Sequence, residues 1–351
     1  MSLTSSYLKK LISDKAKELG FVHTGFSKAE ILENESAKLK EWLDSGFAAD
    51  MTWIEKGFDK RRNVNMIMED AKSVISLAYN YYTPIEHNET LPKISRYAWG
   101  RDYHKILKPK LKELCEFIRL HCEERSNKVI SEFASLQLAM LYYVDDGPVM
   151  DKAWAVKSGI GWMGKHTNVI SPKYGSWLFL CEIITNIEFD EYDSPLEDLC
   201  GSCTLCISAC PTGAIEEYKV DANLCISYQT IENRGEIPDN INLDGWIFGC
   251  DVCQDVCPYN SPKYNHPTDD LNFYPKEELT MSPPSQGGVP VGGGGHHFLD
   301  ICSDKSGVRW KDKSKLTQIA EEEFNKIFAN SPVKRTKYKG WKRNLEKISP
   351  R

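Results

Sequence analysis

The hydrophobic pattern of the first half of the chain alternates between helical and strand-like stretches. Residues 7–19 place apolar side chains at helical spacing and end at Gly20, which predicts a helix. Residues 73–82 (SVISLAYNYY) are rich in β-branched and aromatic residues, which predicts a buried strand. Residues 104–124 repeat Leu and Ile at helical spacing, so we expect a long helix that Pro109 either kinks or begins.

Shorter elements follow this helix in the same alternating order. The pattern predicts strands at 141–144, 168–171 and 176–186, and a helix at 149–158. Strands that alternate with helices favour an α/β or α+β domain, which we place from the N-terminus to about residue 190.

The remainder of the chain divides into two further stretches. A length of 351 residues favours two domains, here with a tail. We expect domains at 1–190 and 191–262, followed by a linker, an insertion, a C-terminal helix and a basic tail at 263–351. Within that last stretch, residues 282–295 (SPPSQGGVPVGGGG) have the composition of a flexible linker, and residues 316–329 predict a helix.

Eight of the twelve cysteines fall into two runs, and this is the strongest chemical signal in the chain. The first run comprises Cys200, Cys203, Cys206 and Cys210 before Pro211, and the second comprises Cys250, Cys253 and Cys257 before Pro258, with Cys225 standing alone ahead of it. In two-cluster ferredoxins the fourth cysteine of each run ligates the other cluster. One [4Fe–4S] cluster would therefore take Cys200, Cys203, Cys206 and Cys257. The other would take Cys210, Cys225, Cys250 and Cys253.

Structural zinc is the alternative for such cysteines, since paired Cys-x-x-Cys units also build zinc sites. Zinc sites usually separate the two pairs by a dozen or more residues, whereas this chain runs directly into a Cys-Pro. Disulfides are disfavoured, because Met1–Gly20 is amphipathic and lysine-bearing and does not resemble a signal peptide. No window approaches the ~20 apolar residues of a membrane span. We therefore expect a soluble, reduced, cytoplasmic protein and take monomer as the default state.

The net charge of −6 argues against a protein held to nucleic acid by its overall charge. The charge is uneven, however, because residues 331–344 contain basic residues and no acid. The basic residues are Lys334, Arg335, Lys337, Lys339, Lys342 and Arg343, with Tyr338 and Trp341 among them. This segment is either an ordinary solvated surface or a patch for phosphates whose aromatic rings stack on bases.

Three further features outside the cysteine runs have a chemical interpretation and a structural one. Gly159-x-Gly161-x-x-Gly164 matches a dinucleotide-binding pattern, but it follows a predicted helix instead of a strand, so we expect close approach to another flat or bulky ligand. Asp145 follows a strand and precedes a Gly-Pro turn, where it could be catalytic or stabilise the turn, a role that suits Asp146 better. His166 lies among apolar residues, where a packing role is commoner than ligand binding.

Taken together, these features resemble the epoxyqueuosine reductase family of cobalamin-dependent iron–sulfur enzymes, which are related to corrinoid reductive dehalogenases. The similarity covers about residues 8–262 and 316–344. Its marks are Ser95–Lys105 (SRYAWGRDYHK), Val144-Asp145 with Gly147-Pro148, Gly159–Lys165 (GIGWMGK), Tyr174-Gly175-Ser176, the order of the cysteines, Cys225–Tyr228, and the tail at Ser331–Arg335 and Arg343-Asn344.

The resemblance implies cofactors, a substrate and site residues. It implies cobalamin in the domain at 1–190, a ferredoxin-like domain with two [4Fe–4S] clusters at 191–262, and a tRNA substrate with a GUN anticodon. The enzyme would reduce the epoxide at the wobble base through cob(I)alamin, with Asp145 as proton donor. Arg61, Asp145, His166, Val169 and Ser227 occupy positions that resemble the cobalamin pocket of the family. His166 departs from the Asn usual in relatives, and the linker at 282–295 departs from the family as well.

Other functions remain open from the sequence alone. A corrinoid iron–sulfur reductase of a small molecule, such as an organohalide, would share the cofactors but need no basic docking surface. A non-catalytic electron carrier would hold clusters without tightly bound cobalamin. A zinc-structured RNA-binding protein would have no visible-light chromophore. In either reductase, a low-potential electron donor would feed the clusters.

Overall fold

The computed structural model describes residues 5–87, 91–126, 138–275 and 318–348. The chain forms two compact units, each assembled from separate stretches. Unit 1 comprises Met1–Asn80, Tyr103–Asn223 and Val252–His266, and unit 2 comprises Tyr81–Asp102, Leu224–Asp251 and Pro267–Arg351. These stretches cut across the three consecutive parts expected from the sequence, and that three-part division stays a prediction.

A four-stranded antiparallel sheet forms the centre of unit 1, in the order β1-β2-β7-β4. Its strands are β1 (His23–Lys28), β2 (Ser73–Asn80), β4 (Met140–Tyr143) and β7 (Leu178–Thr185). Every residue of β2 is buried, which agrees with a sequence that contains small and apolar residues and no charged one. The mixed α/β class is confirmed, in its α+β form.

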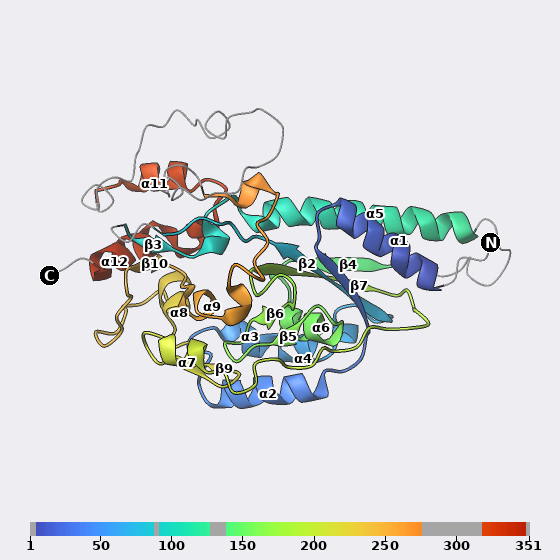
Figure 1. Cartoon of the computed structure of the whole chain (residues 1–351), viewed down its shortest axis with the longest axis horizontal. Coiled ribbons are helices and arrows are strands. Elements are labelled where there is room, and N and C mark those ends of the chain that lie inside the picture. The colour runs from blue at the N-terminus through green and yellow to red at the C-terminus, as the bar shows by residue number, and fades with distance from the viewer. Residues whose placement is uncertain (1–4, 88–90, 127–137, 276–317, 349–351) are drawn as a thin grey trace. The chain divides into compact units, whose positions relative to one another are not determined.

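Helices cover both faces of this sheet (Figure 1). α1 (Ser5–Glu18) and the long α5 (Tyr103–Ser126) lie together on one face, and α6 (Asp151–Lys157) packs against β2 and β7 on the other. α1 buries Leu8, Ile12 and Ala16 at helical spacing, as its pattern predicts. Pro109 lies inside α5, six residues after its first residue Tyr103.

The smaller elements of unit 1 surround this core. They are α2 (Glu33–Asp44), α3 (Thr52–Lys56), α4 (Phe58–Arg62), η1 (Val64–Met66), the hairpin β5 (Trp162–Met163) and β6 (Val169–Ile170), α7 (Leu205–Ala209), the hairpin β8 (Ile215–Glu216) and β9 (Lys219–Val220), α9 (Val252–Asp255) and η3 (Pro258–Asn260).

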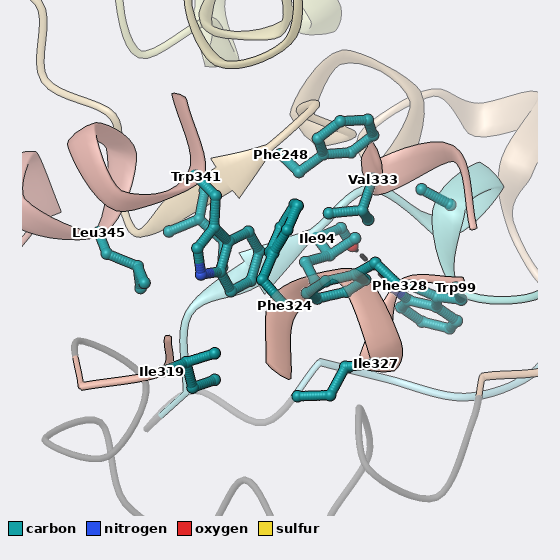
Figure 2. Packing of buried hydrophobic residues seen from close by; sticks show 12 residues of the cluster. Ile94, Trp99, Phe248, Ile319, Phe324, Ile327, Phe328, Val333, Trp341 and Leu345 are labelled. Carbon is teal, nitrogen blue, oxygen red and sulfur yellow. Dashed lines mark hydrogen bonds between the residues drawn. The ribbon is translucent and has the colours of Figure 1, made fainter. Parts of the chain in front are cut away.

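Unit 2 is built around one aromatic core. Its elements are β3 (Lys93–Ile94), η2 (Arg96–Ala98), α8 (Ile226–Ile231), β10 (Trp246–Phe248), η4 (Leu271–Phe273), α11 (Glu321–Ile327), η7 (Pro332–Thr336) and α12 (Lys337–Ile348). Figure 2 shows Phe324, Phe328 and Trp341 packed together in this core, with Ile94, Trp99 and Phe248 around them. β3 and β10 pair in parallel and contribute Ile94 and Phe248 to it.

The predicted elements of the first half are confirmed, with ends that differ by a few residues. The predicted strand at 73–82 ends at Asn80. The predicted helix at 316–329 is observed from Glu321 to Ile327, and residues 316 and 317 of the prediction lie outside the described part of the chain. The linker at 282–295 also lies outside the described residues.

Candidate functional site

Four cysteine thiols line one cavity of about 40 Å³ inside unit 1. They belong to Cys200, Cys203, Cys206 and Cys257, the set expected for the first cluster. Cys206 lies in the first turn of α7, and Cys257 immediately precedes η3. α7 packs against α9, which brings the first cysteine run together with Cys253 and Cys257 of the second within this unit. We call this space the cluster cavity.

The surroundings of the cluster cavity suit a group that carries positive metal charge. Burial raises the pKa of Cys200, Cys206 and Cys257, in the last case to about 11, and neighbouring thiols raise the pKa of Cys206 and Cys257 further. Bound iron removes this penalty, because thiolate is the form that ligates metal. Backbone N–H groups already point at these sulfurs, from Lys165 to Cys200 and from Tyr259 to Cys257. The donor set therefore fits a cubane cluster.

The second predicted ligand set is distributed over the two units. Cys210 and Cys253 belong to unit 1, where the Cys210 sulfur accepts a hydrogen bond from the backbone N–H of Ala214 at 3.3 Å. Cys225 and Cys250 belong to unit 2, where Cys225 stands at the N-terminus of α8.

The segment between β5 and β6 forms one wall of the cluster cavity. Lys165 and His166 both line the cavity and are buried, with 5% and 3% of their surfaces exposed. The Lys165 ammonium donates to the Gly201 carbonyl at 2.8 Å and to the Glu217 carboxylate at 2.7 Å. Burial lowers the pKa of His166 to about 4, so its imidazole is neutral at pH 7. The sequence pattern did not single out Lys165.

The glycines of the Gly159–Gly164 segment serve the fold of the chain itself. A Cβ on Gly161 would lie 2.2 Å from the Ile170 carbonyl oxygen, and one on Gly159 would lie 2.8 Å from the Ser194 carbonyl oxygen. Gly159 has a φ of +75° and follows α6, as expected for a helix end. The expectation that these glycines admit a flat ligand was wrong here, because the chain's own backbone fills the space.

Asp145 follows β4 and has a backbone φ of +53°, a conformation that is uncommon for residues other than glycine. Its carboxylate accepts a hydrogen bond from the Tyr103 hydroxyl at 2.8 Å. The Tyr103 ring stacks on Phe179, with ring centroids 4.5 Å apart, which fixes the direction of that hydroxyl. Tyr103 looked like an ordinary first-turn residue of a helix in the sequence, and only the fold reveals this contact.

Asp146 has the turn role that its position suggested. Its carboxylate accepts the backbone N–H of Val144 at 3.0 Å and forms an ion pair with Lys108. Burial raises the pKa of Asp146, but the hydrogen bonds from Lys108 and Val144 and the charge of Lys108 together outweigh burial, so the net pKa lies below its ordinary value.

Two further carboxyl groups lie in the interior of unit 1 near Asp145. Glu182, in β7, is fully buried, and its carboxyl group lies close enough to that of Asp151, the first residue of α6, for a proton on one of them to join the two in a hydrogen bond. Burial raises the pKa of both groups, and Glu182 is raised well above its ordinary value. Among the described residues, Arg61 of α4 places a positive charge near Asp151, which acts against the effect of burial on the pKa of Asp151. A single acid within an apolar strand, LFLCEIIT, was the signal for Glu182 in the sequence.

The remaining predicted site residues have separate environments. The Arg61 guanidinium is half-buried and donates to the Trp53 and Ile54 carbonyls at 3.4 Å each. Val169 is buried in a small apolar cluster with Ala78, Ala155 and Ile160. Ser227 belongs to unit 2, in the first turn of α8.

The aromatic residues of the basic segment in unit 2 are structural. Trp341 is 1% exposed, and the Tyr338 hydroxyl donates to the Ile319 carbonyl at 2.9 Å. The expectation that these rings stack on bases was wrong, because both pack against the aromatic core. Arg335 forms an ion pair with Glu232, and Arg343 donates to the Asn233, Gly235 and Gln229 carbonyls. The exposed cations that remain in this segment are Lys334, Lys337, Lys339 and Lys342.

Comparisons with known proteins agree with this site. Residues 199–260 match the family model "4Fe-4S double cluster binding domain", and residues 61–132 match "Epoxyqueuosine reductase QueG, DUF1730". The epoxyqueuosine reductase of Cellulophaga algicola is 41% identical over 339 residues, which cover 96% of each chain. The chain belongs to the epoxyqueuosine reductase family. It is therefore an oxidoreductase with a double [4Fe–4S] domain.

Solved structures of epoxyqueuosine reductases share this fold. One, with an epoxyqueuosine-modified tRNA-Tyr stem loop, matches with a TM-score of 0.76 and 26% identity, over 98% of this chain and 81% of that one. Another, from Bacillus subtilis, has its catalytic aspartate loop swung out of the active site; its TM-score is 0.73 at 27% identity, over 98% and 82% of the two chains. Among the described residues of this family member, no helix is both long and apolar enough to cross a membrane.

Proposed function

We propose that this protein reduces the epoxide of epoxyqueuosine at the anticodon wobble position of tRNA, giving queuosine. The observation that carries the proposal is the four-thiol cluster cavity in a chain whose near full-length relatives are epoxyqueuosine reductases. The tRNA stem loop bound by a solved relative supports tRNA as the substrate class.

The chemistry requires both electrons and protons. Converting an epoxide to an alkene consumes two electrons and two protons and releases the oxygen as water. Two bound clusters, held by the cysteines of the two runs and each able to carry one electron at a time, would supply the electrons from a low-potential donor. The oxygen that leaves carbon develops negative charge, so an acid must lie within hydrogen-bond reach of it.

Asp145 is the acid that we assign to this step. The positive φ at Asp145 holds the residue in a strained conformation just after β4, and such strain is common at functional sites. The hydrogen bond from Tyr103 orients one carboxyl oxygen and leaves the other for the substrate. The catalytic aspartate loop of the Bacillus subtilis relative supports an aspartate in this role.

Cobalamin is the second cofactor that we propose. When bound, it supplies a strongly nucleophilic cobalt centre that can attack an epoxide carbon. Arg61 and Asp145 fit such a group, because both present polar atoms that can bind its amide side chains, and the hydrogen bonds of Arg61 to the Trp53 and Ile54 carbonyls are long. Val169 fits less well, because its side chain is only 3% exposed and packs in an apolar cluster. Ser227, which belongs to unit 2, stays a predicted contact.

The anticodon arm would dock on the exposed lysines of the C-terminal segment. Lys334, Lys337, Lys339 and Lys342 are solvent-exposed, and lysines of this kind bind phosphates as point charges. We omit Arg335 and Arg343 from this surface, since one has an acidic partner and the other binds backbone carbonyls.

An anaerobic assay tests the proposal. The full-length protein is reconstituted with iron, sulfide and cobalamin, given a low-potential reductant, and incubated with tRNA that carries epoxyqueuosine. Mass spectrometry of the digested tRNA should show the loss of one oxygen atom, and only when cobalamin is present. If the clusters and cobalamin are bound but the nucleoside is unchanged, the substrate is a different molecule and the tRNA assignment fails.

A further inference from the structure

His166 is buried and has one ring nitrogen that lacks a protein partner. Its Nδ1 accepts a hydrogen bond from the backbone N–H of Asn168 at 3.2 Å. A neutral imidazole that accepts at Nδ1 carries its proton on Nε2, which makes Nε2 a hydrogen-bond donor. Among the described residues, nothing accepts that proton, although only 3% of the residue is exposed. An unsatisfied buried donor is costly, so it indicates a partner that the polypeptide does not provide.

The position of the ring indicates what that partner is. His166 lines the cluster cavity together with the thiols of Cys200, Cys203, Cys206 and Cys257. Its neighbour Lys165 lines the same cavity, but the Lys165 ammonium already donates to the Gly201 carbonyl and the Glu217 carboxylate. Of these two side chains, His166 is therefore the one whose N–H group no described protein group accepts.

Neighbouring groups of the chain also fix the position of the His166 ring. A Cβ on Gly164 would lie 3.0 Å from the His166 Cε1 and 2.6 Å from the Ile170 Cδ1. Glycine at 164 thus leaves the space that the imidazole and Ile170 occupy, and the backbone N–H of Asn168 fixes the rotation of the ring. A donor held in this way loses little entropy when it binds a ligand.

We propose that the Nε2–H group of His166 donates a hydrogen bond to a sulfur atom of the [4Fe–4S] cluster in this cavity, and so raises the reduction potential of that cluster. Accepting an electron adds one negative charge to the cluster, and hydrogen bonds to its sulfurs stabilise the more negative state. This hydrogen bond would affect one cluster whatever the substrate is, and so lies outside the reaction itself. It also makes His166 a contact of the cluster and not of cobalamin.

The test is a reduction potential measured without substrate or cobalamin. Full-length wild-type protein and the His166→Phe variant are reconstituted with iron and sulfide and titrated with dithionite, following the electron paramagnetic resonance signal of the reduced clusters. Phenylalanine keeps an aromatic ring and removes the donor. We expect one cluster to become harder to reduce, with the ratio of reduced to oxidised form falling on the order of tenfold at a fixed potential, equivalent to about 59 mV. The other cluster should not change.

Two variants sharpen this comparison. His166→Gln places an amide N–H at nearly the same reach, so it should restore most of the potential. His121→Phe is the matched control, because His121 lies on α5, contacts the Phe117 carbonyl, and does not line the cavity. An unchanged potential in His166→Phe with both clusters intact, or an equal shift in His121→Phe, would overturn the proposal.

A measurement on the wild-type protein covers the case in which His166→Phe does not retain its cluster. In protein labelled with ¹⁵N-histidine, electron–nuclear double resonance of the reduced cluster should show a weakly coupled histidine nitrogen and a proton that exchanges in D₂O. The absence of both couplings would contradict the hydrogen bond. Cobalamin titration of His166→Phe adds a third test: weaker binding with unchanged potentials would make His166 a cobalamin contact.

Discussion

Unit 1 contains two groups of acidic side chains that are arranged in different ways. The thiols of the cluster cavity face an open space, and nearby N–H groups point at their sulfurs. The carboxyl groups of Asp151 and Glu182 lie close enough to share a proton, inside a sheet and helix that leave Glu182 no exposure. The first group needs metal charge to become stable, whereas the second needs only a proton. A buried acidic cluster therefore indicates a metal site only when it surrounds a space.

Removing one thiol should have the largest effect. Cys257→Ala takes a ligand from the cluster cavity, and the described residues that line the cavity include no further thiol that could replace it. We expect about half of the bound iron to be lost, and turnover to fall below detection, as measured by iron analysis and the tRNA assay. Cys115→Ala, which alters a buried cysteine of α5 outside both runs, should keep full iron. Normal iron in Cys257→Ala would contradict the ligand assignment.

Removing the proton of Asp145 should have the next largest effect. Asp145→Asn keeps the shape of the side chain and its contact with Tyr103 but cannot donate an acidic proton. We expect turnover to fall by roughly 10²–10⁴-fold, with iron and cobalamin content unchanged. Asp146→Asn is the control, because an asparagine oxygen can still accept the Val144 N–H. Wild-type turnover in Asp145→Asn would exclude Asp145 as the donor.

The buried carboxyl pair should appear in the pH dependence of stability. The pKa of Glu182 is raised well above the ordinary 4.5 on folding, so the folded state binds more protons than the unfolded state at any pH between the two values. Stability therefore falls as the pH rises above the unfolded pKa, by up to about 1.4 kcal/mol per pH unit.

Glu182→Gln removes this proton uptake, and the amide can still bond to Asp151. Its melting temperature should therefore decline less than that of wild type between pH 5 and pH 8, as followed by circular dichroism. Parallel curves for the two proteins would mean that Glu182 is ionised in the folded state.

The exposed lysines should give the smallest effect. Replacing Lys334, Lys337, Lys339 and Lys342 by alanine should weaken tRNA binding. It should also make the slope of log affinity against log salt shallower, by roughly 0.7–0.9 for each phosphate that a lysine no longer neutralises. Filter binding at several salt concentrations measures both quantities.

Two lysines elsewhere on the chain provide the control for this prediction. Alanine at Lys38 and Lys40 of α2 removes similar exposed charges. If both sets of variants bind tRNA equally weakly, the effect reflects net charge alone.

The sequence predicted the elements that have a strong local pattern. The apolar stripe of α1 was recognisable because its spacing follows from helix geometry, and β2 was recognisable as an uncharged stretch rich in apolar residues. The first cluster ligand set was recognisable because cysteine spacing reflects the size of a cubane. Tyr103 and Lys165 were not recognisable, because their partners Asp145 and Gly201 are 42 and 36 positions away in the chain. Glu182 stood out as an acid in an apolar strand, but its partner Asp151, 31 positions away, did not.

Packing within the chain also explains the predictions that were wrong. In the sequence, a ligand-binding role was considered for the glycines at 159–164 and for the aromatic residues of the basic segment. In the fold, other atoms of the chain fill the space around both groups. A residue type indicates what a side chain can do, and only the fold decides whether it is free to do so.

The aromatic core of unit 2 has a consequence for how the protein is made. Trp99 and Ile94 are synthesised early, yet they pack with Phe324 and Trp341, which follow about 240 residues later. At translation speeds of roughly 5–20 residues per second, the ribosome needs about 12–50 s to cover that distance. During this time the early apolar residues lack these late partners, so nascent chains of this enzyme should depend on chaperones that shield the incomplete core until synthesis reaches α12.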